Sequence, residues 1–203
     1  CILFNMAEHT IPGGTAGTPI IILKDGSTQS RGRDAQKNNL LASKLVVDIV
    51  KSSLGPRGRD KMLVDSLGDV TITNDGATML KELDVQHPAA KMLVEVSKTT
   101  DSEVGDGTTS AVVLAGSLLA KAEELLDKEV HPTLIVDGYL RASENALELL
   151  DKISVKISSD DKDTLNKVAV TSMLTKLVAD DSEDLASLIV DALLEVATPD
   201  NDN

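Results

Sequence analysis

Aromatic residues and cysteines are almost missing from this sequence. It has no Trp, one Tyr, one Phe and one Cys among 203 residues. Proteins that bind single-stranded nucleic acid stack bases on aromatic side chains, so a site of that kind is excluded. A single cysteine, Cys1, cannot form an intrachain disulfide or a cysteine-based metal site. This cysteine usage predicts a cytoplasmic protein.

Long apolar runs and an excess of basic charge are also lacking. The longest strictly aliphatic stretches are 20–23 and 111–115, far short of the roughly 18–20 apolar residues that span a membrane. The 33 Asp and Glu residues outnumber the 20 Lys and Arg residues, which gives a net charge of −13. Neither a membrane nor a nucleic acid is therefore expected as a partner. With 41% apolar and 26% charged residues, the composition is typical of a globular protein whose core is built from Ala, Val, Leu and Ile.

Helical periodicity and turn signals predict a mainly α-helical chain with one small β-hairpin. We expect helices over 34–54, 76–83, 88–100, 110–130, 132–152, 162–173 and 182–197. The hairpin is expected from the runs 61–65 and 70–73, and short strands from 19–23 and 154–157. In the first helix, an apolar stripe marks the face expected to be buried: Leu40, Leu41, Leu45, Val47, Ile49, Val50 and Leu54.

Composition and charge divide the chain into three parts. Residues 1–18 are rich in Gly and lack periodicity, which predicts a flexible tail, and Met6 resembles a translation start that follows upstream or added residues. Residues 1–152 carry 22 acidic and 16 basic side chains, a net charge of −6, whereas 153–203 carry 11 and 4, a net charge of −7. This change predicts a first domain over 19–152 and a second over 153–203.

Three turns that contain glycine lie at predicted helix ends, although the sequence has neither a Walker A nor a GxGxxG motif. The first turn spans 53–58. Gly55 allows another group to approach the backbone closely, and Pro56 fixes the bend. From the sequence pattern alone, an ordinary helix stop is the favoured interpretation of this turn.

The second turn, 74–78, places Asp75 at a helix start. A carboxylate is favoured there as an N-cap. The same carboxylate could instead orient a water molecule for attack on phosphorus. Both interpretations stay open from the sequence.

The third turn, Gly105-Asp106-Gly107-Thr108-Thr109-Ser110, runs directly into a long helix. Glycines expose backbone N–H groups, a helix N-terminus favours anions, and three hydroxyls add donors, so the turn is suited to bind phosphates. Asp106 would repel a triphosphate unless Mg²⁺ lay between them. A flexible capped turn is the alternative.

The remaining candidates for chemistry are weak. His87 and His131 each precede a proline at a predicted helix start and are expected to be structural. Tyr139 is expected to pack rather than to catalyse. The acidic run 180–184 is typical of a solvated helix start. No HExxH or Cys/His pattern indicates zinc.

Taken together, these segments resemble the group II chaperonins of the archaeal thermosome type. The resemblance covers residues 19–197 and is carried by LGPRGRDKMLVD (54–65), TITNDGATML (71–80), the stretch 87–116 with GDGTTS, and TSMLTK (171–176). It implies a helical equatorial ATP-binding domain over 19–152 and the first segment of an intermediate domain over 153–203. The apical domain, the returning half of the intermediate domain and its second carboxylate are expected to be absent from these residues.

The resemblance also implies roles for individual residues. Asp75 is implied as the catalytic carboxylate that positions the attacking water, and Asp106 as the Mg²⁺ ligand. Lys176 is implied as a sensor of the γ-phosphate. The implied nucleotide-binding residues are Leu54, Gly55, Pro56, Gly76, Gly107, Thr108, Thr109, Ser110 and Lys176.

The activity implied is that of an ATP-dependent chaperone subunit. Such a subunit hydrolyses ATP with Mg²⁺ to drive the folding of unfolded client proteins, and its partners are other chaperonin subunits in a double ring. These residues alone are not expected to turn over ATP efficiently. The alternative from the residues is a non-enzymatic, acidic helical module whose glycine turns only cap helices.

Overall fold

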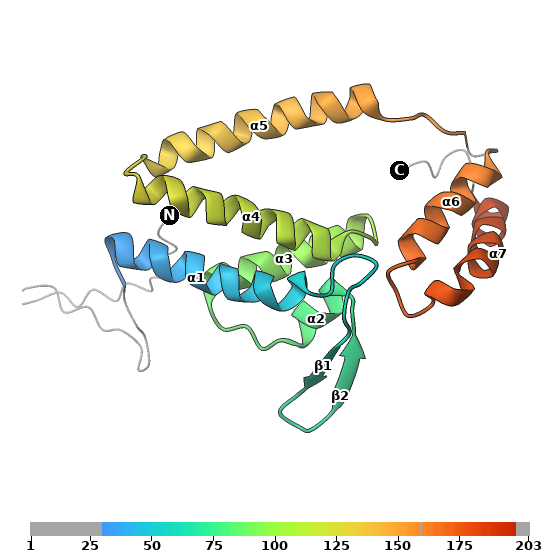
Figure 1. Ribbon diagram of the computed structural model, residues 1–203, viewed down its shortest axis with the longest axis horizontal. Coiled ribbons are helices and arrows are strands. Elements are labelled where there is room, and N and C mark those ends of the chain that lie inside the picture. Colours follow the sequence, from blue (N-terminus) through green and yellow to red (C-terminus); the bar gives the residue numbers. More distant parts are fainter. Residues whose placement is uncertain (1–29, 159, 198–203) are drawn as a thin grey trace, which may run out of the picture. The chain divides into compact units, whose positions relative to one another are not determined.

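Helices account for most of the computed structural model, which describes residues 30–158 and 160–197 (Figure 1). The elements, in chain order, are α1 (Gly32–Lys51), β1 (Lys61–Val64), β2 (Val70–Thr73), α2 (Gly76–Glu82), α3 (Pro88–Glu103), α4 (Thr108–Asp127), α5 (Pro132–Ile153), α6 (Lys162–Met173), the 3₁₀ turn η1 (Ala179–Asp181) and α7 (Ser182–Val196). The expected helical bundle with one hairpin is confirmed. None of the helices in these ranges is long and apolar enough to cross a bilayer.

The core lies where α1, α2, α3 and α4 meet. Its most deeply buried members are Val50, Met79, Leu80 and Val112, each no more than 1% exposed. Burial of such side chains contributes about 1.5–3 kcal/mol each. This core positions two of the three glycine turns: the turn at 74–78, where α2 begins, and the turn at 105–110, where α4 begins.

The buried face of α1 differs from the expected stripe. Val47 and Val50 are buried, but Leu41 and Leu45 are each 58% exposed. The helix instead turns Ser43, Val46, Val47 and Val50 inward, because α4 approaches here through a glycine. A Cβ atom added to Gly116 of α4 would lie 2.3 Å from the Val47 side chain, so only glycine permits this contact.

The β-hairpin is confirmed with its predicted strands. β1 and β2 pair antiparallel, with Lys61 opposite Thr73 and Val64 opposite Val70. The connecting turn is organised by Asp65, whose carboxylate accepts hydrogen bonds from the backbone N–H groups of Leu67 and Asp69. The second strand ends directly before the turn that carries Asp75.

Histidine-proline pairs begin two helices, as expected. The imidazole Nδ1 atoms of His87 and His131 accept hydrogen bonds from the backbone N–H groups of Ala89 and Thr133, so both histidines are N-caps. In the stretch 154–157, however, the predicted strand is wrong. Val155 is 85% exposed there, and the described chain offers no neighbouring strand to pair with it.

Helices α6 and α7 pack against each other, and Lys162 and Asp191 form an ion pair between them at 2.9 Å. The described residues from Gly32 onward belong to one structural unit. A domain boundary near residue 153 stays a prediction. The expected tail at 1–18 and strand at 19–23 lie outside the described residues.

Candidate functional site

The glycine turn at 105–110, the glycine turn at 53–58 and the end of α6 enclose a cavity of about 290 Å³. The loop before α4 forms one wall, the turn after α1 a second, and the segment after α6 a third. The lining residues are Ser53, Leu54, Gly55, Asn74, Asp106, Gly107, Thr108, Thr109, Ser110, Thr171, Ser172, Thr175 and Lys176. Most of these side chains are polar and hydroxyl-bearing, so the cavity is suited to a polar ligand.

The α4 N-terminus is exposed to this cavity without a side-chain cap. Its N-cap residue is Gly107, in the left-handed region with φ 77°, and it has no side chain to accept the first N–H groups. Helices α2, α3, α5 and α6, by contrast, are each capped by an Asp or His side chain. The uncapped N–H groups and the helix dipole therefore favour an anion at this end of α4.

Asp106 lies at the mouth of the same loop. Its Oδ1 accepts a hydrogen bond from the Gly107 N–H at 2.7 Å, and its Oδ2 accepts one from the Ser172 hydroxyl at 3.1 Å. Each carboxylate oxygen keeps a further lone pair, and oxygen is the ligand that Mg²⁺ prefers. No group of three or more His, Cys, Asp or Glu side chains placed to hold a metal ion occurs in 30–158 and 160–197. Any cation would thus need ligand oxygens from elsewhere.

Asp75 is the N-cap of α2 and is also in contact with two other segments. Its Oδ2 accepts hydrogen bonds from the backbone N–H and the hydroxyl of Thr78, as expected of an N-cap. Its Oδ1 faces the Lys176 ammonium at 3.1 Å and the Thr108 hydroxyl at 3.4 Å. The capping role is confirmed, and it leaves the second oxygen directed toward the α4 loop and Lys176.

The environment keeps Asp75 ionised. Partial burial raises the pKa of this carboxyl, but the Thr78 N–H and the Lys176 ammonium together lower it by more. The net pKa therefore lies below the ordinary value of 3.8. An ionised carboxylate at neutral pH can accept a hydrogen bond or a proton from water.

Three polar contacts attach the end of α6 to the loops. Besides the Ser172–Asp106 and Lys176–Asp75 contacts, the Asn74 side-chain amide donates a hydrogen bond to the Thr175 carbonyl oxygen at 2.7 Å. Asn74 and Thr175 are 101 positions apart in the sequence. The cavity is thus closed by hydrogen bonds and an ion pair on this side.

The structure brings most of the predicted site residues together. Eight of them line the cavity: Leu54, Gly55, Asp106, Gly107, Thr108, Thr109, Ser110 and Lys176. Asp75 touches two of these residues. Gly76 is buried behind the loop, where an added Cβ would lie 2.9 Å from the Thr109 backbone nitrogen. Pro56 is not among the lining residues, so direct nucleotide contact by Gly76 and Pro56 stays a prediction.

Sequence reasoning missed several lining residues, above all Asn74 and Ser172. Asn74 directly precedes Asp75, and Ser172 lies within the TSMLTK stretch, so both were within recognised motifs. Only their contacts across the fold single them out. Ser53 begins the first glycine turn, and Thr171 and Thr175 lie in the same TSMLTK stretch as Ser172, so these three residues were also within recognised motifs.

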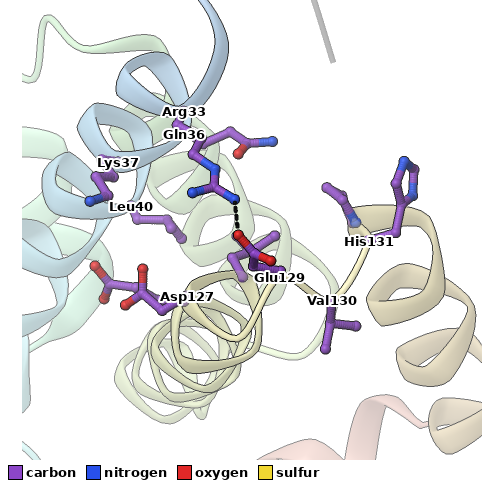
Figure 2. A pocket seen from close by; sticks show the side chains of 11 residues that line it. Arg33, Gln36, Lys37, Leu40, Asp127, Glu129, Val130 and His131 are labelled. Atoms are coloured by element: carbon purple, nitrogen blue, oxygen red, sulfur yellow. Dashed lines mark hydrogen bonds and ion pairs between the residues drawn. The ribbon is translucent and has the colours of Figure 1, made fainter.

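A second cavity, of about 260 Å³, lies between the start of α1 and the turn from α4 to α5 (Figure 2). Arg33 and Glu129 form an ion pair across it at 3.2 Å. Glu129 has φ 64°, and its N–H bonds to the Leu126 carbonyl while Val130 bonds to Leu125, the pattern of a Schellman C-cap. The residues that line this cavity carry charges of both signs, and the hydrogen bonds of Glu129 and Val130 explain why α4 ends here.

The chain has clear relatives among known proteins. The TCP-1/cpn60 chaperonin family matches residues 46–203. The thermosome subunit alpha of Archaeoglobus fulgidus is 56% identical over 181 residues, which cover 89% of this chain and 33% of the relative. The thermosome subunit beta of Thermococcus kodakarensis is 54% identical over 182 residues, or 90% and 33%. The thermosome subunit alpha of Saccharolobus solfataricus is 52% identical over 189 residues, or 89% and 34%. The chain spans about a third of the length of these relatives.

Proposed function

Because the chain belongs to the TCP-1/cpn60 chaperonin family, we propose that it is the ATP-binding part of a chaperonin subunit. It binds ATP with Mg²⁺, and the complete subunit hydrolyses ATP to drive the folding of unfolded proteins. In this proposal residues 19–152 are the N-terminal part of the equatorial domain. Residues 153–203 are the first segment of the intermediate domain.

One observation carries the proposal: the uncapped α4 N-terminus faces Lys176 across a hydroxyl-lined cavity. The free N–H groups of the helix, three hydroxyls and an ammonium together bind the negative charge of a phosphate chain. The turn at Leu54 and Gly55 lines another part of the cavity, where the rest of a nucleotide can lie. A module whose glycine turns only cap helices has no use for such an arrangement.

Asp106 is the residue that holds Mg²⁺ in this proposal. Its carboxylate is exposed at the loop, and Asp106 is the one acidic residue among the described residues that line the cavity. The Asp75 carboxylate is in contact with the lining residues Thr108 and Lys176. Bound Mg²⁺ neutralises phosphate charge and bridges phosphate oxygens. The Ser172 hydroxyl orients the carboxylate from the α6 side.

Asp75 acts as the carboxylate that orients the attacking water. Thr78 fixes the side chain through Oδ2, so Oδ1 keeps one direction toward Thr108 and Lys176. The lowered pKa of Asp75 holds it in the form that accepts a proton. Lys176 contacts the same oxygen, so it lies where it can respond to a phosphate beside Asp75.

The relatives are named as subunits, which supports assembly with other chaperonin subunits. We extend this to a double ring that encloses unfolded client proteins. The proposed location is the cytoplasm. Nucleic acids and membranes are not proposed as partners, because the net charge of −13 opposes binding to phosphate backbones and acidic lipids.

Mg²⁺-dependent ATP binding to the chain tests the proposal, measured by isothermal titration calorimetry with and without the metal. Asp106→Ala should abolish the Mg²⁺-dependent part of the binding, because no second acidic side chain in the described loop replaces it. Asp101→Ala, an exposed acidic change on α3, is the matched control and should bind like the unchanged chain. ATP binding that is equally strong in Asp106→Ala at limiting Mg²⁺ would remove the metal assignment.

Turnover is tested in a chimera in which residues 30–197 replace the matching segment of the Thermococcus kodakarensis thermosome subunit beta. Asp75→Ala in this chimera should leave ATP binding nearly intact and lower hydrolysis by about 10²-fold or more, as for loss of a water-orienting base. If ATP binding falls as much as hydrolysis does, Asp75 is a helix cap and has no catalytic role.

A further inference from the structure

Two consecutive residues of one segment contact two consecutive residues of another. Asn74 Nδ2 donates to the Thr175 carbonyl oxygen at 2.7 Å, and the next residue, Asp75, pairs with the Lys176 ammonium at 3.1 Å. Asn74 lies between β2 and α2, and Thr175 lies just after α6. The hydrogen bond from Asn74 therefore fixes the backbone one residue away from the ion pair.

The ion pair on its own is weakly held. The Lys176 and Asp75 side chains keep 36% and 31% of their exposure, and lysine loses much rotamer freedom when it is held in one geometry. Pairs with this degree of exposure contribute little by themselves. An anchor on the adjacent backbone does not change this rotamer cost, but it fixes the point from which the lysine side chain extends. The ion pair then does not have to order the backbone as well.

The Thr175 carbonyl needs such a donor. Helix α6 ends at Met173, and the following residues form a turn in which Lys176 N–H bonds to the Met173 carbonyl. Thr175 is only partly exposed, and Asn74 supplies the hydrogen bond to its carbonyl oxygen from outside the helix. The amide of Asn74 is thus used for tertiary positioning, whereas Asp75 caps its own helix.

We propose that Asn74 is a positioning residue, which holds the Thr175 backbone so that Lys176 stays at Asp75. The catalytic meaning of this positioning rests on the proposed function, since Lys176 and Asp75 face the phosphate end of the cavity. Asn74 itself has no contact role with substrate in this proposal. Its loss loosens the end of α6 from the turn before α2.

The groups around Asp75 allow a direct test. Lys176 comes from the segment after α6, Thr108 from α4 and Thr78 from α2, and of these only Lys176 is charged. A carboxyl that loses the ammonium titrates at a higher pH, because the partner that favoured its charged form has moved away. The Asp75 carboxyl therefore reports the position of Lys176.

The experiment is an NMR titration of ¹³C-labelled aspartate carboxyls in the nucleotide-free chain. Asn74→Ala should raise the pKa of Asp75 by more than half of the rise that Lys176→Met causes. Adding Asn74→Ala to Lys176→Met should cause no further rise. Asn145→Ala, an exposed asparagine change on α5, is the matched control and should leave the Asp75 titration unchanged.

Asn74→Ser is the second variant. Serine still carries a hydrogen-bond donor, but its shorter side chain does not reach the Thr175 carbonyl, so Asn74→Ser should behave like Asn74→Ala. An unchanged Asp75 pKa in both Asn74 variants, with a rise in Lys176→Met, overturns the proposal. So does an unchanged pKa in Lys176→Met, because the ion pair is then not formed. Since the titration contains no nucleotide, its failure is distinct from a failure of ATP binding.

Discussion

Helices α4 and α5 follow each other in the chain and differ sharply in how their apolar residues are used. On α4, Val112 is fully buried and Gly116 lies directly against Val47 of α1. On α5, Ile135 is the single buried residue when burial is taken against the described part of the chain. Leu140 and Leu147 remain 59% and 64% exposed. An amphipathic pattern predicts that a helix has an apolar face, but a partner is needed to bury it.

The largest expected effect separates a core leucine from an α5 leucine. Leu80→Ala removes a side chain that is 1% exposed and should lower the free energy of unfolding by about 2–5 kcal/mol. Leu147→Ala changes a side chain that is 64% exposed and should cost less than about 1 kcal/mol. Urea unfolding followed by circular dichroism measures both. Equal losses would mean that α5 is packed as tightly as the core.

A matched pair of helical glycines sharpens the comparison at a smaller scale. Gly116→Ala on α4 forces Val47 to move and should destabilise the chain by about 1–3 kcal/mol. Gly138→Ala on α5 meets no atom within 4 Å and should stabilise it by about 0.5–1 kcal/mol through higher helix propensity. Thermal unfolding midpoints should thus move in opposite directions. A shift of the same sign in both variants would contradict the close contact at Gly116.

The smallest expected effect compares two ion pairs over pH. Lys176→Met should lower stability at pH 7 by a few tenths to about 1 kcal/mol, since the pair with Asp75 is only partly exposed. Asp75 has a folded-state pKa below 3.8, so the pair stabilises fully above that range and stops doing so as pH falls through the lowered pKa. The difference between Lys176→Met and the unchanged chain should therefore vanish in acid.

Lys162→Met is the control, because the Lys162–Asp191 pair joins α6 to α7 at the surface. Its effect at pH 7 should be smaller and should fade in 1 M salt, where the screening length is about threefold shorter than at physiological salt. Denaturant unfolding at several pH values measures both variants. A Lys176→Met effect that persists at a pH where Asp75 is protonated would show that the lysine acts through packing.

Local signals in the sequence predicted most of the elements, while contacts between distant residues limited the rest. His87-Pro88 and His131-Pro132 predicted helix starts because cap and proline act within one turn. The buried face of α1 was misplaced, since the approach of Gly116 is a tertiary contact. The strand predicted at 154–157 failed because β-branched residues need a partner strand.

The candidate site followed the same division. The glycine loops could be found because left-handed residues and an uncapped helix are local features, and Gly107 has φ 77°. Membership of the chaperonin family, expected from the same loops, is confirmed by the family match. The bond from Asn74 to Thr175 could not be found, because nothing local relates residues 101 positions apart.

Tyr139 gives the chain an optical reporter at a defined place. It is the only tyrosine, there is no tryptophan, and the one phenylalanine absorbs at shorter wavelength, so fluorescence excited in the tyrosine band comes from this one ring. Its hydroxyl donates a hydrogen bond to the Leu118 carbonyl of α4 at 2.6 Å. The emission therefore reports whether α5 stays on α4. A tyrosine signal that changes before the circular dichroism would record the detachment of α5 while the α1–α4 core is still folded.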